Sequence, residues 1–208
     1  MRAVYRISKS VNVFFHPILF PLYAFLLLYF FSNVIWFFVN DAQFIILLTF
    51  IAVTAVVIPM VCFFLIKKIS KVRNIVRNTK YHALSFCVLF EAMVYVAISY
   101  SMMKIEVPRV LSDFFMVSAM ALILLSIISL FVTLDFHSIS LGTLTGMFVH
   151  MLTVGMTNNH TILIILILLV GMVGTSRILI HKEFTFLYHL GALLGVCFGF
   201  AASYFLFG

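Results

Sequence analysis

Long apolar stretches alternate with short polar segments along this 208-residue chain. Seven of these stretches have about the length that an α-helix needs to cross the hydrocarbon core of a bilayer. They cover residues 14–39, 43–66, 83–101, 114–133, 139–157, 161–180 and 186–207. Backbone polar groups find no water in hydrocarbon, so each stretch is expected to be a helix that satisfies its own hydrogen bonds. The pattern predicts an all-α, polytopic transmembrane helical bundle of about seven spans.

Composition agrees with this interpretation. Hydrophobic residues make up 65% of the chain and charged residues only 9%. A soluble domain cannot bury that much apolar surface, and a membrane barrel would alternate apolar and polar residues in short segments. We therefore expect residues 1–13 to form a cytoplasmic N-terminal lead-in and residues 14–208 to form a single transmembrane domain.

Two local features affect the boundaries of the spans. Pro17, Pro21 and Pro59 fall inside predicted spans, where proline is tolerated but is expected to kink the helix. The fourth and fifth spans are separated only by the short polar segment 134–138, so they could also be one broken helix.

The basic residues are distributed unevenly between the two sides of the predicted bundle. Of the 13 Lys and Arg residues, only Lys104 and Arg109 lie on one side. The remaining eleven share the other side: Arg2, Arg6, Lys9, Lys67, Lys68, Lys71, Arg73, Arg77, Lys80, Arg177 and Lys182. Since positive loops stay in the cytoplasm, this bias predicts a cytoplasmic N-terminus and an external C-terminus.

The segment 67–82 is the longest polar segment and carries six of these basic residues. One interpretation is a juxtamembrane anchor attracted to anionic lipid head groups. The other is a cradle for a phosphate group. Nucleic acid is not an expected partner, because a loop at the membrane edge offers no fold that presents side chains to bases.

Polar residues within the spans point to the interior of the bundle. Glu91 in the third span and His150 in the fifth lie at similar depth, and ionisable residues in membrane helices usually face the interior or a cavity. We expect them to form an intramembrane polar pair, or else to find separate partners. Glycines at four-residue spacing in 142–146 and 191–199 predict close packing between helices of the same chain.

Polar residues of the predicted cytoplasmic loops follow a recognisable order. The order is Arg77-x-x-Lys80, then His137-Ser138-Ile139-Ser140, then Ser176-Arg177 followed by Glu183 and Tyr188-His189-x-Gly191. This layout resembles the type 2 phosphatidic acid phosphatase superfamily. It is similar in particular to a compact integral membrane branch of Bacteroidetes-type bacteria, in which a His-Pro-x-x-x-Pro-x-Tyr element, here 16–23, opens the first span. The resemblance covers residues 16–195.

The resemblance implies a phosphatase-like core with a site for an anionic phosphoryl group. Its phosphate-binding positions are those of Arg77, Lys80, Ser138 and Arg177. In such enzymes one histidine attacks phosphorus and a second protonates the leaving oxygen.

The two catalytic positions depart from the family pattern. Ser140 occupies the position of the acid and Glu183 that of the nucleophile. We therefore expect a phosphatase-like protein that lacks the catalytic histidine pair.

Three functions follow as hypotheses. The first is a non-catalytic membrane subunit that binds lipids, expected to have anionic head groups, or a membrane-protein partner. The second is an active lipid or isoprenyl phosphate phosphatase that uses the displaced histidines His137 and His181. The third is an unrelated transporter-like bundle. No metal and no cofactor are expected, since Cys62, Cys87 and Cys197 lack the spacing of metal ligands.

Overall fold

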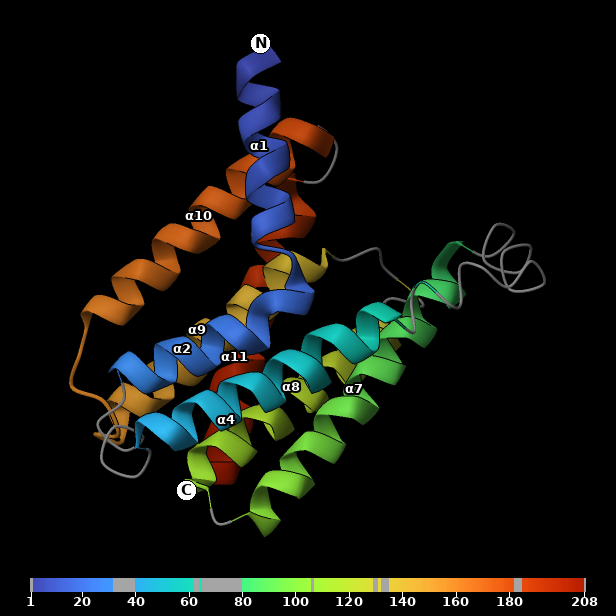
Figure 1. Ribbon diagram of the computed structural model, residues 1–208. Coiled ribbons are helices and arrows are strands. Elements are labelled where there is room, and N and C mark those ends of the chain that lie inside the picture. Colours follow the sequence, from blue (N-terminus) through green and yellow to red (C-terminus); the bar gives the residue numbers. More distant parts are fainter. Residues whose placement is uncertain are drawn as a thin grey trace.

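The computed structural model describes residues 2–31, 40–61, 64, 80–105, 107–128, 131, 135–181 and 185–207. These residues form helices and turns, and no strand occurs among them (Figure 1). The α-helices are α1 (Arg2–Phe14), α2 (Phe20–Phe31), α4 (Asp41–Ile51), α7 (Lys80–Lys104), α8 (Arg109–Ile128), α9 (Phe136–Thr153), α10 (Thr161–His181) and α11 (Thr185–Phe207). A turn of 3-10 helix, η1 (Pro17–Leu19), precedes α2, and a π-helical stretch, η2 (Ala52–Val57), follows α4.

Each of the seven predicted stretches overlaps at least one of these helices. By length and composition, four described helical segments can cross a membrane: Asp41–Val61, Arg109–Ile128, Thr161–Ile180 and Phe186–Leu206. Phe20–Phe31 is equally apolar but shorter. The all-helical prediction is therefore confirmed for the described residues. The four segments are compatible with an integral membrane protein.

The helix is interrupted at the start of the first predicted span. The lead-in is a helix, α1, which continues to Phe14, and α2 begins only at Phe20. His16 stands immediately before Pro17, and the residue before a proline is disfavoured in the helical conformation. Pro21 then lies in the first turn of α2, where proline is tolerated. The first apolar stretch therefore does not run as one helix from residue 14.

A π-helical stretch changes the course of the second predicted span. The capping box of Asn40 and Gln43 starts α4, with Gln43 N donating to Asn40 Oδ1 at 2.8 Å and Asn40 N donating to Gln43 Oε1 at 3.1 Å. The helix widens into η2 at 52–57, shortly before Pro59. Proline has no N–H to donate and its ring crowds the carbonyl one turn earlier, which accounts for the altered winding here.

Helix α9 is the central element of the bundle and packs most closely on α11. A Cβ atom at Gly142 or Gly146 would collide with the backbone of α11, and one at Gly195 or Gly199 would collide with the backbone of α9. Only residues without a side chain allow this approach. The prediction that these glycines pack within one chain is confirmed.

The polar content of α9 fits its position. Most of its residues are buried by other helices, including His137, Thr143 and His150. A helix that is enclosed by protein needs no continuous apolar surface toward lipid. Its two histidines and several hydroxyl residues are thereby accommodated inside the bundle.

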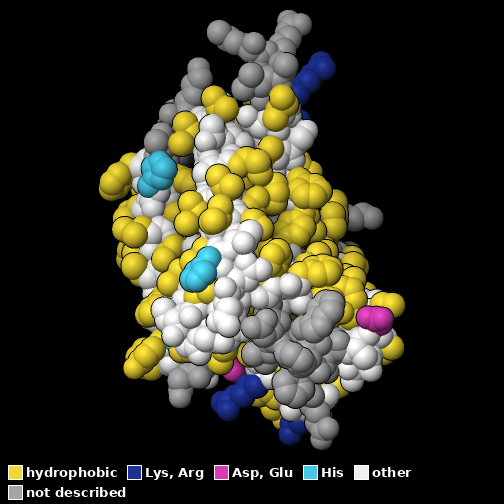
Figure 2. Space-filling view, turned by 90° about the vertical axis from the view of Figure 1, so that its left-hand side faces the viewer, with side chains coloured by type: hydrophobic (Ala, Val, Ile, Leu, Met, Phe, Trp, Pro, Cys, Tyr) yellow, Lys and Arg dark blue, Asp and Glu magenta, His cyan; other side chains and the backbone are white. Residues whose placement is uncertain are grey.

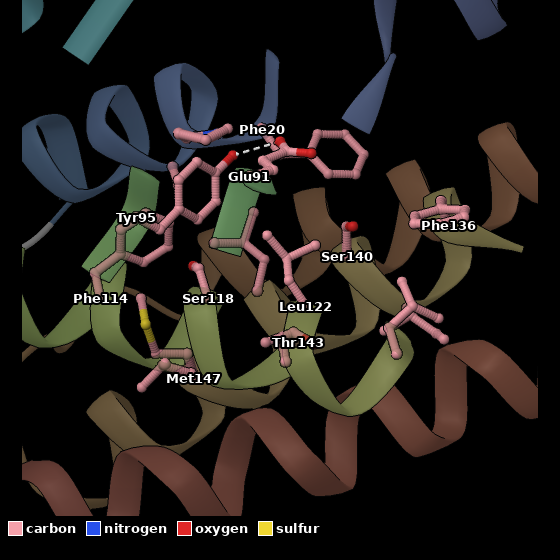
Figure 3. Close-up of a pocket in the computed structure, with 17 residues that line it drawn as sticks. Phe20, Glu91, Tyr95, Phe114, Ser118, Leu122, Phe136, Ser140, Thr143 and Met147 are labelled. Carbon is pink, nitrogen blue, oxygen red and sulfur yellow. Dashed lines mark hydrogen bonds between the residues drawn. The ribbon is translucent and has the colours of Figure 1, made fainter. Parts of the chain in front are cut away.

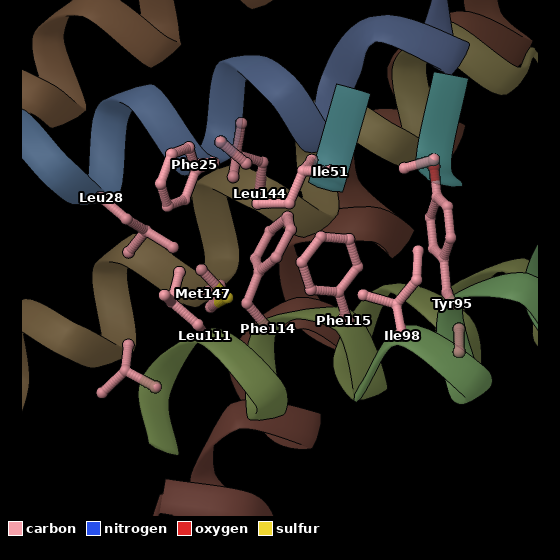
Figure 4. Packing of buried hydrophobic residues seen from close by; sticks show 14 of the residues in the cluster. Phe25, Leu28, Ile51, Tyr95, Ile98, Leu111, Phe114, Phe115, Leu144 and Met147 are labelled. Carbon is pink, nitrogen blue, oxygen red and sulfur yellow. The ribbon is translucent and has the colours of Figure 1, made fainter. Parts of the chain in front are cut away.

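The hydrophobic core lies between α2, α4, α7, α8 and α9 (Figure 4). Fully buried side chains from each of these helices meet there, among them Phe25, Ile51, Ile98, Phe115 and Met147. Helices α7 and α8 pair along their length and form one wall of this core.

The outer surface is largely apolar. Figure 2 shows one face covered by hydrophobic side chains, with the few described charged side chains toward its upper and lower ends. Large exposed apolar residues occur on several helices, such as Ile46 of α4, Met93 of α7, Leu168 of α10 and Phe205 of α11. The chain ends marked N and C lie at opposite ends of the bundle (Figure 1).

Candidate functional site

An ion pair joins the start of α9 to the last turns of α10. Nη2 of Arg177 donates to Oδ1 of Asp135. Asp135 is also the N-cap of α9, because its Oδ2 accepts a hydrogen bond from the backbone N–H of Ser138 at 3.3 Å. The exposed fractions of the two side chains are 11% for Asp135 and 27% for Arg177. One carboxylate therefore caps one helix and pairs with the arginine of another.

Two histidines lie beside this ion pair. Nδ1 of His137 is 3.8 Å from Oδ2 of Asp135, which is an electrostatic contact rather than a hydrogen bond. Neither ring nitrogen of the buried His137 has a hydrogen-bond partner among the described residues. His16, in the break between α1 and α2, packs edge-to-face on His137, with ring centroids 5.8 Å apart. We refer to Asp135, Arg177, His137 and His16 as the end cluster.

The end cluster favours the charged form of its carboxyl group. Burial alone would raise the pKa of Asp135, but its contacts with His137 and Arg177 outweigh burial and hold the pKa below the usual value of 3.8. Asp135 is therefore ionised at neutral pH and neutralises Arg177. A phosphate that approaches this guanidinium would be repelled by the negatively charged carboxylate of Asp135.

Ser138 and Ser140, the two serines that the sequence-based hypotheses single out, have different surroundings. Ser138 is fully buried, its hydroxyl donates to the backbone oxygen of Asp135 at 2.7 Å, and a Cβ atom at Gly191 would collide with it. Ser140 instead lines a pocket between α2, α7, α8 and α9. The hydroxyl of Ser138 is thus engaged in the first turn of α9.

Several predicted site residues cannot be placed. Arg77 and Glu183 lie outside the described residues. Lys80 begins α7 and His181 ends α10, but their side chains are also outside the described part of the chain. The anion-binding set Arg77, Lys80, Ser138 and Arg177 stays a prediction, and so does the His137–His181 pair.

Glu91 and His150 have different neighbours. The hydroxyl of Tyr95 donates to Oε1 of Glu91 at 2.9 Å, one helical turn away on α7. His150 packs edge-on against Phe200 and Tyr204 of α11, with ring centroids 5.5 and 5.9 Å away. These contacts favour separate partners for the two residues. Their direct pairing stays a prediction.

A pocket opens beside Glu91 within the bundle (Figure 3). Its cavity volume is about 60 Å³, or about 640 Å³ when all the open space at its mouth is counted. Most of the wall is apolar, with Phe20, Phe114, Leu122 and Met147 among its residues. The polar groups of the wall are those of Glu91, Tyr95, Ser118, Ser140 and Thr143. An apolar cavity with a few polar groups is the usual form of a small-molecule site.

Asp135 is the residue of the end cluster that the sequence-based hypotheses did not include. Its signal was its place as the only acidic residue of the polar segment between two spans, directly before a helix start. Its pairing with Arg177, 42 positions away, needs the packing of α9 on α10. Among the described residues, no group of three or more His, Cys, Asp or Glu side chains is arranged to hold a metal ion.

No protein-family model matches the chain, and neither a curated protein nor a solved structure is similar to it. The described part of the chain is all-helical, and four of its segments are able to cross a membrane by length and composition. The resemblance to phosphatidic acid phosphatases stays a prediction from the sequence motifs.

Proposed function

We propose that this chain is a non-catalytic integral membrane protein that binds a lipid inside its helical bundle. The observation that carries the proposal is the pocket between α2, α7, α8 and α9, which combines an apolar wall with a small group of polar side chains. Lipid-like ligands have the matching construction, a hydrocarbon body with one polar end. The ligand would enter from the bilayer that surrounds the helices.

The end cluster supports the non-catalytic part of the proposal. Phosphoryl transfer needs cationic groups that are free to stabilise charge on the phosphoryl oxygens. Arg177 is instead paired with Asp135, and the hydroxyl of Ser138 donates to a backbone oxygen. Ser140, at the position of the general acid, belongs to the wall of the pocket.

A second candidate function is phosphatase activity with displaced histidines. One observation favours it: Asp135 lies 3.8 Å from His137, and His16 packs on the same ring. A carboxylate beside a histidine can orient the imidazole and stabilise its protonated form. In this reading His181 would be the second histidine of the pair.

Purification with assay of lipid and phosphate separates the two functions. We expect the protein, extracted in an uncharged detergent, to retain lipid that native mass spectrometry detects. We also expect no release of phosphate from phosphatidic acid, lysophosphatidic acid or isoprenyl diphosphate above a protein-free control, because Arg177 is held by Asp135. Rapid phosphate release that is abolished by His181→Ala, and preserved in His160→Ala at the other end of α10, would contradict the non-catalytic proposal.

We propose a bacterial inner membrane as the location, with the N-terminus in the cytoplasm and the C-terminus outside. The charge bias of the sequence and the opposite positions of the two chain ends in Figure 1 support this orientation. Exposed Arg6 and Lys9 on α1 suit contact with anionic lipid head groups on the cytoplasmic side. A membrane-protein partner at this basic end remains part of the proposal.

Reporter fusions test the orientation. A periplasm-active phosphatase reporter at the C-terminus should be active, and a cytoplasm-active fluorescent reporter at the N-terminus should be bright, since an odd number of crossings separates the ends. A C-terminal fusion truncated after residue 106, between α7 and α8, is the matched control and should also be active. If both termini lie on the same side of the membrane, the number of crossings is not odd and the proposed orientation is wrong.

A further inference from the structure

The pocket between α2, α7, α8 and α9 has an acidic side chain in its wall. Glu91 contributes a carboxyl group, and the described residues of the wall include no Lys, Arg or His. The hydroxyl of Tyr95 donates to Oε1 of this carboxyl group, which leaves Oε2 without a protein donor among the described residues. An anionic head group in this pocket would lie next to a carboxyl group, and no described residue of the wall supplies a cation to balance the two.

Thr143 differs from many hydroxyl residues of the described helices. Hydroxyls such as those of Thr49, Thr54, Thr145 and Thr175 donate to a carbonyl three or four residues earlier, whereas the buried hydroxyls of Thr143 and of Ser99 on α7 do not. The hydroxyl of Thr143 is buried and has no hydrogen-bond partner among the described residues. A buried polar group without a partner is destabilising, so a ligand that satisfies it gains affinity.

Thr143 and Glu91 belong to the same pocket, together with Ser140. Ser140 and Thr143 are three residues apart and therefore share one face of α9. Figure 3 shows Glu91 on α7 across the pocket from these two hydroxyl residues. These three residues thus supply a carboxyl group and two hydroxyl groups, all of which can accept hydrogen bonds, and the hydroxyls of Tyr95 and Ser118 complete the polar part of the wall.

We propose that this pocket binds an amphiphile with an amine head group, whose ammonium is held by Glu91 and by the hydroxyls of Ser140 and Thr143. A primary ammonium carries three N–H donors and no acceptor, which matches three acceptors in one pocket. Its positive charge balances the carboxylate away from water, where an unbalanced charge is costly. The hydrocarbon tail lies along the apolar wall formed by residues such as Phe114 and Leu122. This inference rests on the proposed lipid-binding function and specifies its head group.

Three probes with the same tail and different heads test the proposal. The full chain is reconstituted in nanodiscs of phosphatidylcholine, and the midpoint temperature of unfolding is followed while dodecylamine, dodecanol or dodecyl phosphate is added. We expect dodecylamine to raise the midpoint saturably at concentrations at least tenfold lower than dodecanol. Dodecyl phosphate should give no saturable increase.

Variants of the pocket assign the binding to these residues. Glu91→Gln should abolish the preference for dodecylamine over dodecanol. Its control is Asp113→Asn, which removes a buried carboxyl group on α8 that is paired with Arg109 at 3.6 Å and is not part of the pocket. The control should keep the full preference.

Thr143→Val gives a readout that a purely structural role would not produce. It should weaken dodecylamine binding about threefold or more while leaving the ligand-free protein as stable as before or more stable, because it removes an unpartnered buried hydroxyl. Thr145→Val is the control on the same helix. Its hydroxyl donates to the oxygen of Leu141 at 2.8 Å, so the variant should lose stability and keep its affinity for the amine.

The outcomes distinguish the inference from the function on which it rests. If dodecyl phosphate binds as tightly as dodecylamine, or if Glu91→Gln retains the amine preference, the amine head group is wrong. If dodecanol and dodecylamine then bind equally well and Thr143→Val weakens both, lipid binding in the pocket is retained. If no probe binds and no lipid is retained on purification, both proposals fail.

Discussion

Replacement of Gly146 by leucine is expected to destabilise the protein by about 3 kcal/mol, because the new side chain has no room between α9 and α11. A Cβ atom at Gly146 would collide with backbone atoms of Val196 and Phe200. Backbone cannot rotate away as a flexible side chain can, so the two helices must separate. For a chain of this length the midpoint temperature of unfolding should fall by about 6 to 12 °C. Thermal unfolding monitored by fluorescence-detected size exclusion measures this change.

The matched control for this prediction is Gly171→Leu. Gly171 lies on α10, another membrane-crossing segment, and nothing lies within 4 Å of a Cβ atom built there. The same substitution should leave the midpoint almost unchanged or raise it slightly, because leucine favours helix more than glycine does. A fall of similar size in both variants would mean that the close contact of α9 with α11 is not the cause.

Removal of either partner of the Asp135–Arg177 ion pair is expected to cost about 2 kcal/mol, because it leaves a shielded charge without compensation. The expected cost stays below that of a fully buried pair, since 27% of the Arg177 side chain is exposed. Asp135→Asn is the sharper variant, because an asparagine oxygen can still cap the N–H of Ser138. Its loss of stability therefore reports on the charge and not on the cap.

A double-mutant cycle measures the pair directly. Asp135→Asn combined with Arg177→Gln should be clearly less destabilised than the sum of the two single variants, because neither charge remains uncompensated. Additive effects would mean that the two charges do not interact. Asp113→Asn with Arg177→Gln provides the comparison cycle and should be additive.

The pH dependence of stability should also show the contribution of ionised Asp135. The folded-state pKa of Asp135 is lowered from 3.8, so its contribution is fully present above that value. The contribution is lost as the pH falls through 3.8 and further through the lower folded-state pKa. Unfolding midpoints between pH 6 and pH 3 should therefore fall more steeply for the unmodified chain than for Asp135→Asn. Identical slopes would contradict a lowered pKa.

Much of the fold follows from the apolar pattern, because helix formation in a bilayer is decided locally. Each predicted stretch overlaps a helix, and the glycine spacing identified the faces on which α9 and α11 meet. The exception is the start of the first span, where hydropathy continues through residues 14–19 but the prolines do not permit one helix. Hydropathy measures partition into lipid and does not register backbone constraints at Pro17.

The candidate site was harder to predict from the sequence than the helices, because its contacts join distant parts of the chain. Arg177 was recognised as important, but its partner Asp135 became evident only from the packing of α9 against α10. Similarly, the pocket gathers residues from α2, α7, α8 and α9, and Thr143 carries no motif. Spacing along a sequence predicts which residues share a helix face, but not which faces from different helices surround a cavity.

The contact between α9 and α11 also limits how this sequence can diverge. Substitutions on the outer face of α10 exchange one apolar residue for another against lipid, so that surface can change freely. Positions 142, 146, 195 and 199 can accept little beyond glycine while the helices keep their separation. Descendants that retain the architecture should therefore be recognisable by this spaced set of glycines long after their lipid-facing residues have become unrelated.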